Sequence, residues 1–164
     1  MRLYVESQLP TDVDGAWDVY ESAEYKRRLR EQTRIQQEVL ETLTEGEVEV
    51  RRIRTEPDRE LPAMVAKALG TKRLSYVQTS RLDRAAGRVE WTVDLDGIGD
   101  RVRVSGTTTC VPAEGGCKRV IDGEISVDVP LIGRQIERQV VAAFEDSMRR
   151  ANEVALAIIR ERIA

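Results

Sequence analysis

The fold is decided by residues 117–137, which read CKRVIDGEISVDVPLIGRQIE. From Ile121 to Val127 small or apolar residues alternate with polar ones, which is typical of a strand with one buried face. Pro130 has no N–H group for a sheet and ends the strand. Over 131–164 apolar residues recur every three or four positions, which predicts an amphipathic helix of about 48 Å. A sheet therefore leads directly into a long helix that needs a face to pack against.

The segments before this strand repeat the same alternation. A two-residue turn at Glu45 and Gly46 indicates a hairpin, and strands linked by short turns indicate an antiparallel sheet. We therefore predict an α+β fold: a single domain over 1–164 in which a curved antiparallel sheet of six to seven strands wraps around the C-terminal helix, with two short helices after the first strand. The predicted strands are 2–9, 36–44, 47–55, 72–82, 87–96, 101–111 and 117–129; the other helices are a short one capped by Thr11 or Asp12, then 18–34 and 61–69.

The composition excludes several classes of function. The 164 residues are 41% hydrophobic and 34% charged, with a net charge of −3 from 26 basic and 29 acidic side chains. This balance argues against a nucleic-acid-binding domain, which needs a basic excess. The chain has no histidine, which excludes Ser-His-Asp triads, Cys-His dyads and His-ligated metals. We expect no metal and no cofactor.

The sequence also predicts where the chain resides. It has no apolar stretch of the length that a signal peptide or a membrane span requires, so we expect a cytoplasmic protein. Cys110 and Cys117 would lie opposite each other if a four-residue loop joined their strands, and we expect them to be reduced. The basic run 26–30 is interleaved with glutamates and favours a solvated helix face; a transient contact with anionic lipid headgroups is the alternative.

Successive side chains of a strand point to opposite faces of the sheet, and this alternation predicts which residues lie on the inner face. A short loop after Leu95 would pair Val93 with Val104 and Trp91 with Gly106, so that the indole lies across the neighbouring strand. The same reasoning directs polar residues inward as well, either to a solvated sheet margin or into an apolar cavity. The inward sets are Leu74, Tyr76, Gln78 and Ser80 on one strand and Val48, Val50, Arg52 and Arg54 on another, with Glu41 facing Val50.

The element order and residues 117–137 resemble the START-like, or helix-grip, superfamily, which includes the birch-pollen allergen and steroidogenic lipid-transfer domains. More closely, the chain resembles the bacterial family called domain of unknown function 2505. The Val-Pro-Leu-Ile-Gly…Ile-Glu motif of 129–137 is also similar to that of PRELI-like phospholipid-transfer proteins. The superfamily implies a cavity between sheet and helix for lipids, sterols or polyketides, and the resemblance supplies no catalytic residue.

These features lead us to expect the non-enzymatic binding or transport of a hydrophobic small molecule or lipid. Arg52 or Arg54 would contact an anionic headgroup. One alternative is a polyketide cyclase or aromatase-like enzyme, for which Tyr76, Glu41 and Arg52 are the candidates. Another is an interaction module whose cavity is filled by its own side chains. The expected cavity lining is Tyr76, Gln78, Trp91, Val93, Val104, Ile125, Val140, Phe144 and Met148.

Overall fold

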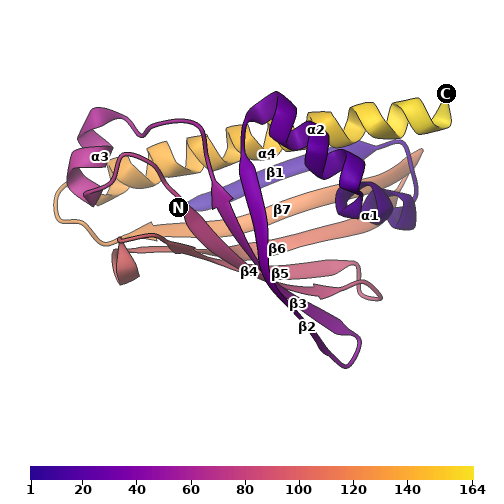
Figure 1. The fold of residues 1–164 in the computed structure, drawn as a ribbon, viewed down its shortest axis with the longest axis horizontal. Helices are drawn as coiled ribbons and strands as arrows, with labels where there is room; N and C mark the ends of the chain where they lie inside the picture. The colour runs from indigo at the N-terminus through magenta and orange to yellow at the C-terminus, as the bar shows by residue number, and fades with distance from the viewer.

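A computed structural model describes all 164 residues. Seven antiparallel strands form one sheet in the order β1-β7-β6-β5-β4-β3-β2. Helix α4 lies along one face of the curved sheet, with α3 near its beginning and α1 and α2 near its end (Figure 1). This confirms the predicted α+β helix-grip fold. The elements are β1 (Arg2–Leu9), α1 (Val13–Glu21), α2 (Ala23–Thr33), β2 (Gln36–Glu45), β3 (Val48–Glu56), α3 (Ala63–Leu69), β4 (Tyr76–Asp83), β5 (Arg88–Leu95), a 3₁₀ turn η1 (Gly99–Arg101), β6 (Val102–Ala113), β7 (Gly116–Val127) and α4 (Gly133–Ile163).

The two helices predicted after the first strand are present, but the boundary between them lies at Ser22, so that residues 18–21 end α1 and do not begin the second helix. The backbone of Ser22 is extended, and its hydroxyl accepts a hydrogen bond from the N–H of Tyr25 at 3.1 Å, which caps α2. Asp12 caps α1 in the same way, through the N–H of Gly15 at 2.7 Å. The break matters for the site because it lets α1 and α2 bend over the inner face of the sheet.

The motif between β7 and α4 is explained by two contacts. A Cβ atom on Gly133 would lie 2.7 Å from the carbonyl oxygen of Val127, so only glycine lets the helix start this close to the strand. The carboxylate of Glu137 then accepts a hydrogen bond from the N–H of Val127 at 3.0 Å. Together they fix the direction in which α4 leaves the sheet.

The register of β5 and β6 confirms the pairing that was predicted from the alternation of side chains. Val93 pairs with Val104 and Trp91 with Gly106, as predicted. The six-membered ring of Trp91 lies over two paired glycines: a Cβ on Gly106 would be 2.6 Å from its Cζ2 atom, and a Cβ on Gly123 would be 2.8 Å from its Cη2 atom. The missing side chains on β6 and β7 therefore make the space for the indole.

The prediction for β3 is wrong. The hairpin turns at Gly46 and Glu47, and a bulge shifts the β2 register between Val39 and Glu41, so that Glu41 faces Arg52 and not Val50. The inner residues of β3 are those paired with the inner residues of β4: Thr55 with Tyr76, Ile53 with Gln78 and Arg51 with Ser80. Val48, Val50, Arg52 and Arg54 therefore lie on the outer face.

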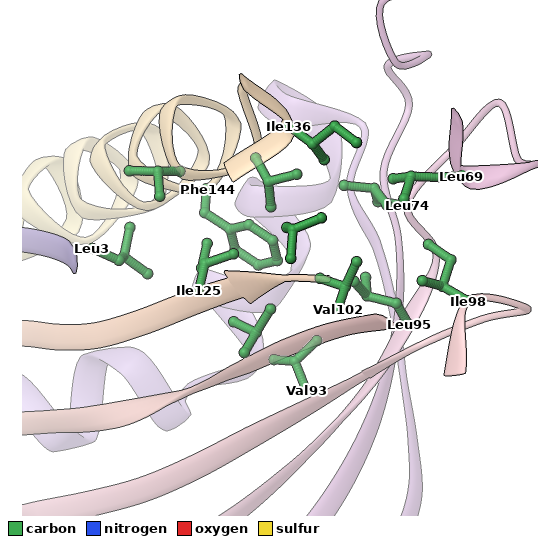
Figure 2. Close-up of a cluster of buried hydrophobic side chains, with 14 of the residues drawn as sticks. Leu3, Leu69, Leu74, Val93, Leu95, Ile98, Val102, Ile125, Ile136 and Phe144 are labelled. Carbon is green, nitrogen blue, oxygen red and sulfur yellow. The ribbon is translucent and has the colours of Figure 1, made fainter. Parts of the chain in front are cut away.

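The hydrophobic core lies between α4 and the sheet. Figure 2 shows Phe144 pointing from α4 toward the strands, above Ile125 and Val93. A second buried cluster, which includes Trp17 and Ile158, joins α1 and α2 to the end of α4. The cavity described below lies where these two clusters meet.

The two cysteines are diagonal neighbours rather than a facing pair. The hairpin is closed by a two-residue turn after Ala113, so Cys117 pairs with Pro112 and Cys110 with Arg119. Both are free thiols with their Sγ atoms 3.5 Å apart, and both are buried. Burial raises the pKa of both thiols, that of Cys117 to about 12.

We therefore expect the folded, reduced protein to resist alkylation by iodoacetamide at about pH 8, because the thiolate is the reacting form. Mass spectrometry should find no added group on the native chain and two after unfolding in guanidinium chloride with a reductant. Rapid labelling of the native chain at either cysteine would contradict this burial.

Candidate functional site

A cavity of about 260 Å³ lies between the inner face of the sheet, α4 and the α1–α2 pair. Fourteen of its 23 lining residues are hydrophobic. Trp17 comes from α1, Leu29 from α2, Trp91 from β5, and Phe144 and Met148 from α4. Residues far apart in the sequence thus line a mainly apolar space, which is typical of small-molecule sites.

Neutral polar groups line the strand side of this cavity. The amide of Gln78 donates to the hydroxyl of Ser80 at 2.9 Å, and the indole N–H of Trp91 donates to the hydroxyl of Thr108 at 3.1 Å. Burial raises the pKa of Tyr76, so its phenol stays protonated at neutral pH. These groups can donate or accept hydrogen bonds, but none of them carries a charge.

Two arginines bring charge to the cavity. Arg51 is 2.6 Å from the carboxylate of Glu21, which also lines the cavity, and it forms a second ion pair with Glu49. Arg119 lies with its guanidinium carbon 4.1 Å from the ring centroid of Tyr20 and donates to the side-chain oxygen of Asn152 at 3.0 Å. Arg51 is thus neutralised by two carboxylates, whereas Arg119 has neutral partners.

A second cavity of about 210 Å³ adjoins the first, toward the β3–α3 loop. The rings of Tyr76 and Phe144 line both cavities, with their centroids 5.5 Å apart. Ile35, Thr55 and Ser147 also line both. These five shared side chains lie at the boundary between the two cavities.

The structure divides the predicted lining residues into two groups. One group lines the larger cavity: Tyr76, Gln78, Trp91, Phe144 and Met148. The other group packs into the core on the side of the cluster nearer α3 and lines neither cavity: Val93, Val104, Ile125 and Val140. All nine lie between the sheet and α4, but only the first group lines a cavity.

The predicted headgroup contacts and two of the catalytic candidates lie outside the cavity. Arg54 points to the outer face, where it forms an ion pair with Asp96 at 2.6 Å. Arg52 lies 3.8 Å from the carboxylate of Glu41 on the same exposed face. Of the three catalytic candidates only Tyr76 remains in the cavity.

The residues missed by sequence reasoning are mostly on α1, α2 and β3. Arg119 has the same parity as Ile121 on β7, which was a usable signal for an inward side chain. Tyr20 and Glu21 gave no signal, because helical periodicity alone does not say which strands a helix will cover.

No group of three or more Cys, Asp or Glu side chains is arranged to hold a metal ion. No helix is both long and apolar enough to span a bilayer.

The sheet and the long helix define the helix-grip fold, which solved structures share. By sequence, the chain belongs to the family described as protein of unknown function (DUF2505), whose model matches residues 5–159. No curated protein matches the chain.

Solved structures share the fold at low sequence identity. A Thermus thermophilus protein, TTHA0849, has a TM-score of 0.70 and 12% identity, with both chains covered completely. The Zhui aromatase/cyclase from a Streptomyces species has a TM-score of 0.69 and 13% identity, covering 100% of this chain and 96% of its own. A Thalictrum flavum norcoclaurine synthase point mutant, in complex with a transition-state analogue, has a TM-score of 0.65 and 15% identity, with the same coverage. At such identities the likeness shows the fold alone.

Proposed function

We propose that this protein binds a hydrophobic small molecule in the cavity between the sheet, α4 and the α1–α2 pair. The observation that carries the proposal is the cavity of about 260 Å³ with mostly apolar walls and a few polar groups. Such walls make the transfer of an apolar molecule from water favourable, and the polar groups orient it. The adjoining space of about 210 Å³ leaves room for a longer guest.

Binding without chemistry is better supported than a cyclase-like reaction. General acid–base catalysis needs an ionisable group within reach of the guest. Tyr76 keeps its proton and can act only as an acid, and the carboxylate that lines the same cavity, Glu21, is held by Arg51 at 2.6 Å. Glu41 and Arg52 face away from the cavity, so the candidates for proton transfer do not converge on one point.

The test is a titration with N-phenyl-1-naphthylamine, a neutral dye whose emission rises in apolar surroundings. The wild-type protein should bind it saturably. In Ala151→Phe, a benzyl-sized group enters the cavity from α4, and the affinity should fall at least about tenfold. Ala157→Phe is the matched control, because Ala157 lies on the same helix but is exposed and lines neither cavity. The affinity of this variant for the dye should equal that of the wild type.

Circular dichroism should show that both variants are folded, because overpacking at Ala151 costs about 1–3 kcal/mol. An unchanged affinity in a folded Ala151→Phe protein would place the dye elsewhere and overturn the proposal. No binding by the wild type would favour the interaction module whose cavity is filled by its own side chains. Native mass spectrometry of the gently purified protein gives an independent reading, since a retained guest adds its mass.

A further inference from the structure

Arg119 differs from the other arginines of the two cavities in its partners. Arg51 pairs with Glu21 and Glu49. Arg59 and Arg150, which line the second cavity, both pair with Asp146. Arg119 lines the larger cavity, and no carboxylate lies within ion-pair distance of its guanidinium. The cavity therefore contains one positive charge that the protein itself does not neutralise.

The guanidinium of Arg119 is held in place by neutral groups. It stacks on the ring of Tyr20 and donates to the side-chain oxygen of Asn152. Asn152 is buried and is fixed by two further hydrogen bonds: its amide donates to the hydroxyl of Ser7 at 2.6 Å, and its oxygen accepts from the phenol of Tyr20 at 2.5 Å. Four elements, β1, β7, α1 and α4, thus orient this one cation before any guest arrives.

An arginine has five N–H donors in a planar fork. Asn152 accepts from one of them, the phenol of Tyr20 lies within reach of another, and no carboxylate accepts from the rest. A charge that is partly removed from water without a counter-ion is costly, and the cost is recovered when an anion binds. A neutral donor would suffice to complete the Asn152 cluster, so the structural role alone does not require an arginine.

We infer that the guest is a hydrophobic carboxylate whose head binds to Arg119 while its apolar part lies against Trp91, Phe144 and Met148; this inference rests on the proposed function. The planar fork matches a carboxylate in two-point geometry. One unpaired arginine supplies one charge, which suits a monoanion better than a phosphate dianion. The head is thereby placed on the inner face of the sheet, and not at Arg52 or Arg54 on the outer face.

The experiment is displacement of N-phenyl-1-naphthylamine by decanoate and by decanol, which share one chain and differ in charge. The measured quantity is the ratio of the two inhibition constants, decanol over decanoate. Arg119→Gln should lower this ratio about tenfold relative to wild type, because the ratio cancels any change that affects the charged and the neutral ligand alike. Arg119→Lys keeps the positive charge but lacks the planar guanidinium with its paired N–H donors, so it should give an intermediate ratio. This variant tests the inference if Arg119→Gln does not fold.

Arg103→Gln is the matched control. Arg103 lies exposed on β6 and lines neither cavity, so the variant removes the same charge without altering the site, and the ratio should not change. A purely structural role of Arg119 would weaken all three ligands together and leave the ratio constant. A constant ratio in Arg119→Gln with dye binding intact would overturn this inference alone. Failure of the wild type to bind the dye would overturn the proposed function and this inference with it.

Discussion

Replacing Trp91 by alanine is expected to lower the free energy of unfolding by about 3–5 kcal/mol. The side chain is only 5% exposed and belongs to the core cluster under α4. Its ring fills the space over Gly106 and Gly123, which have no side chains to close the gap. The substitution also removes the donor to the buried hydroxyl of Thr108. Urea denaturation followed by circular dichroism measures the loss.

Trp91→Phe is the comparison for this prediction. A phenyl ring retains part of the contact with the two glycines but has no N–H for Thr108, so its loss should be smaller than that of alanine. A loss below about 1 kcal/mol in the alanine variant would mean that the indole does not pack across β6 and β7.

Gly106→Ala is expected to cost about 3 kcal/mol, at the upper end of the usual effect of overpacking. The new Cβ would lie 2.5 Å from the carbonyl oxygen of Asp122 and 2.6 Å from the Cα atom of Gly123. Both are backbone atoms of the paired strand, so relief requires β7 to move. The third contact, with the ring of Trp91 at 2.6 Å, is removable. The cost should therefore fall, but not vanish, in a Trp91→Ala background.

Ser105→Ala is the control for this glycine. Ser105 is the preceding residue of β6 and is exposed on the outer face, so the change should stay within about 0.5 kcal/mol. Thermal or urea unfolding of Gly106→Ala, of Ser105→Ala and of Gly106→Ala in the Trp91→Ala background gives the comparison. Equal stability of Gly106→Ala and Ser105→Ala would show that the two strands and the indole do not approach this closely.

The pairing at the centre of the sheet could be predicted because apolar and polar residues alternate on both strands. On β5, and on β6 at Val102 and Val104, every second residue is apolar, and only one pairing brings both apolar sets to the same face. Trp91 opposite Gly106 added a size argument to the alternation. The long helix could be predicted for the same reason, since its apolar stripe runs unbroken from Ile136 to Ile159.

The inner face of β3 was mispredicted because the apolar residues in the two halves of this strand point to opposite faces of the sheet. Val48 and Val50 indicate one inner face, whereas Ile53 and Thr55 indicate the other. The valines lie near the tip of the β2–β3 hairpin, which extends beyond the helices (Figure 1). Apolarity there does not indicate which face is buried, because no helix covers that part of the sheet. Arg52 and Arg54 were assigned to the headgroup because they share a face with Val48 and Val50, and that face is the outer one.

The position of the cavity depends on tertiary packing that the local pattern does not contain. Val93 and Val140 were rightly placed between the sheet and α4, but α3 and the core close around them. The open space lies farther along, under α1 and α2, because Ser22 breaks the helical segment and lets its two halves cover the sheet. Neither the position of the break at Ser22 nor the direction of the two helices follows from helical periodicity.

The chain has two tryptophans, and both border the same cavity: Trp17 from α1 and Trp91 from β5. The indole of Trp17 is buried and its N–H has no acceptor, whereas that of Trp91 is bonded to Thr108. A guest that enters would change the polarity around both rings at once. The protein's own ultraviolet emission therefore reports occupancy without a label, and a Trp17→Phe protein isolates the signal from the sheet side. Fractions of a cell extract can be screened in this way before the guest has a known structure.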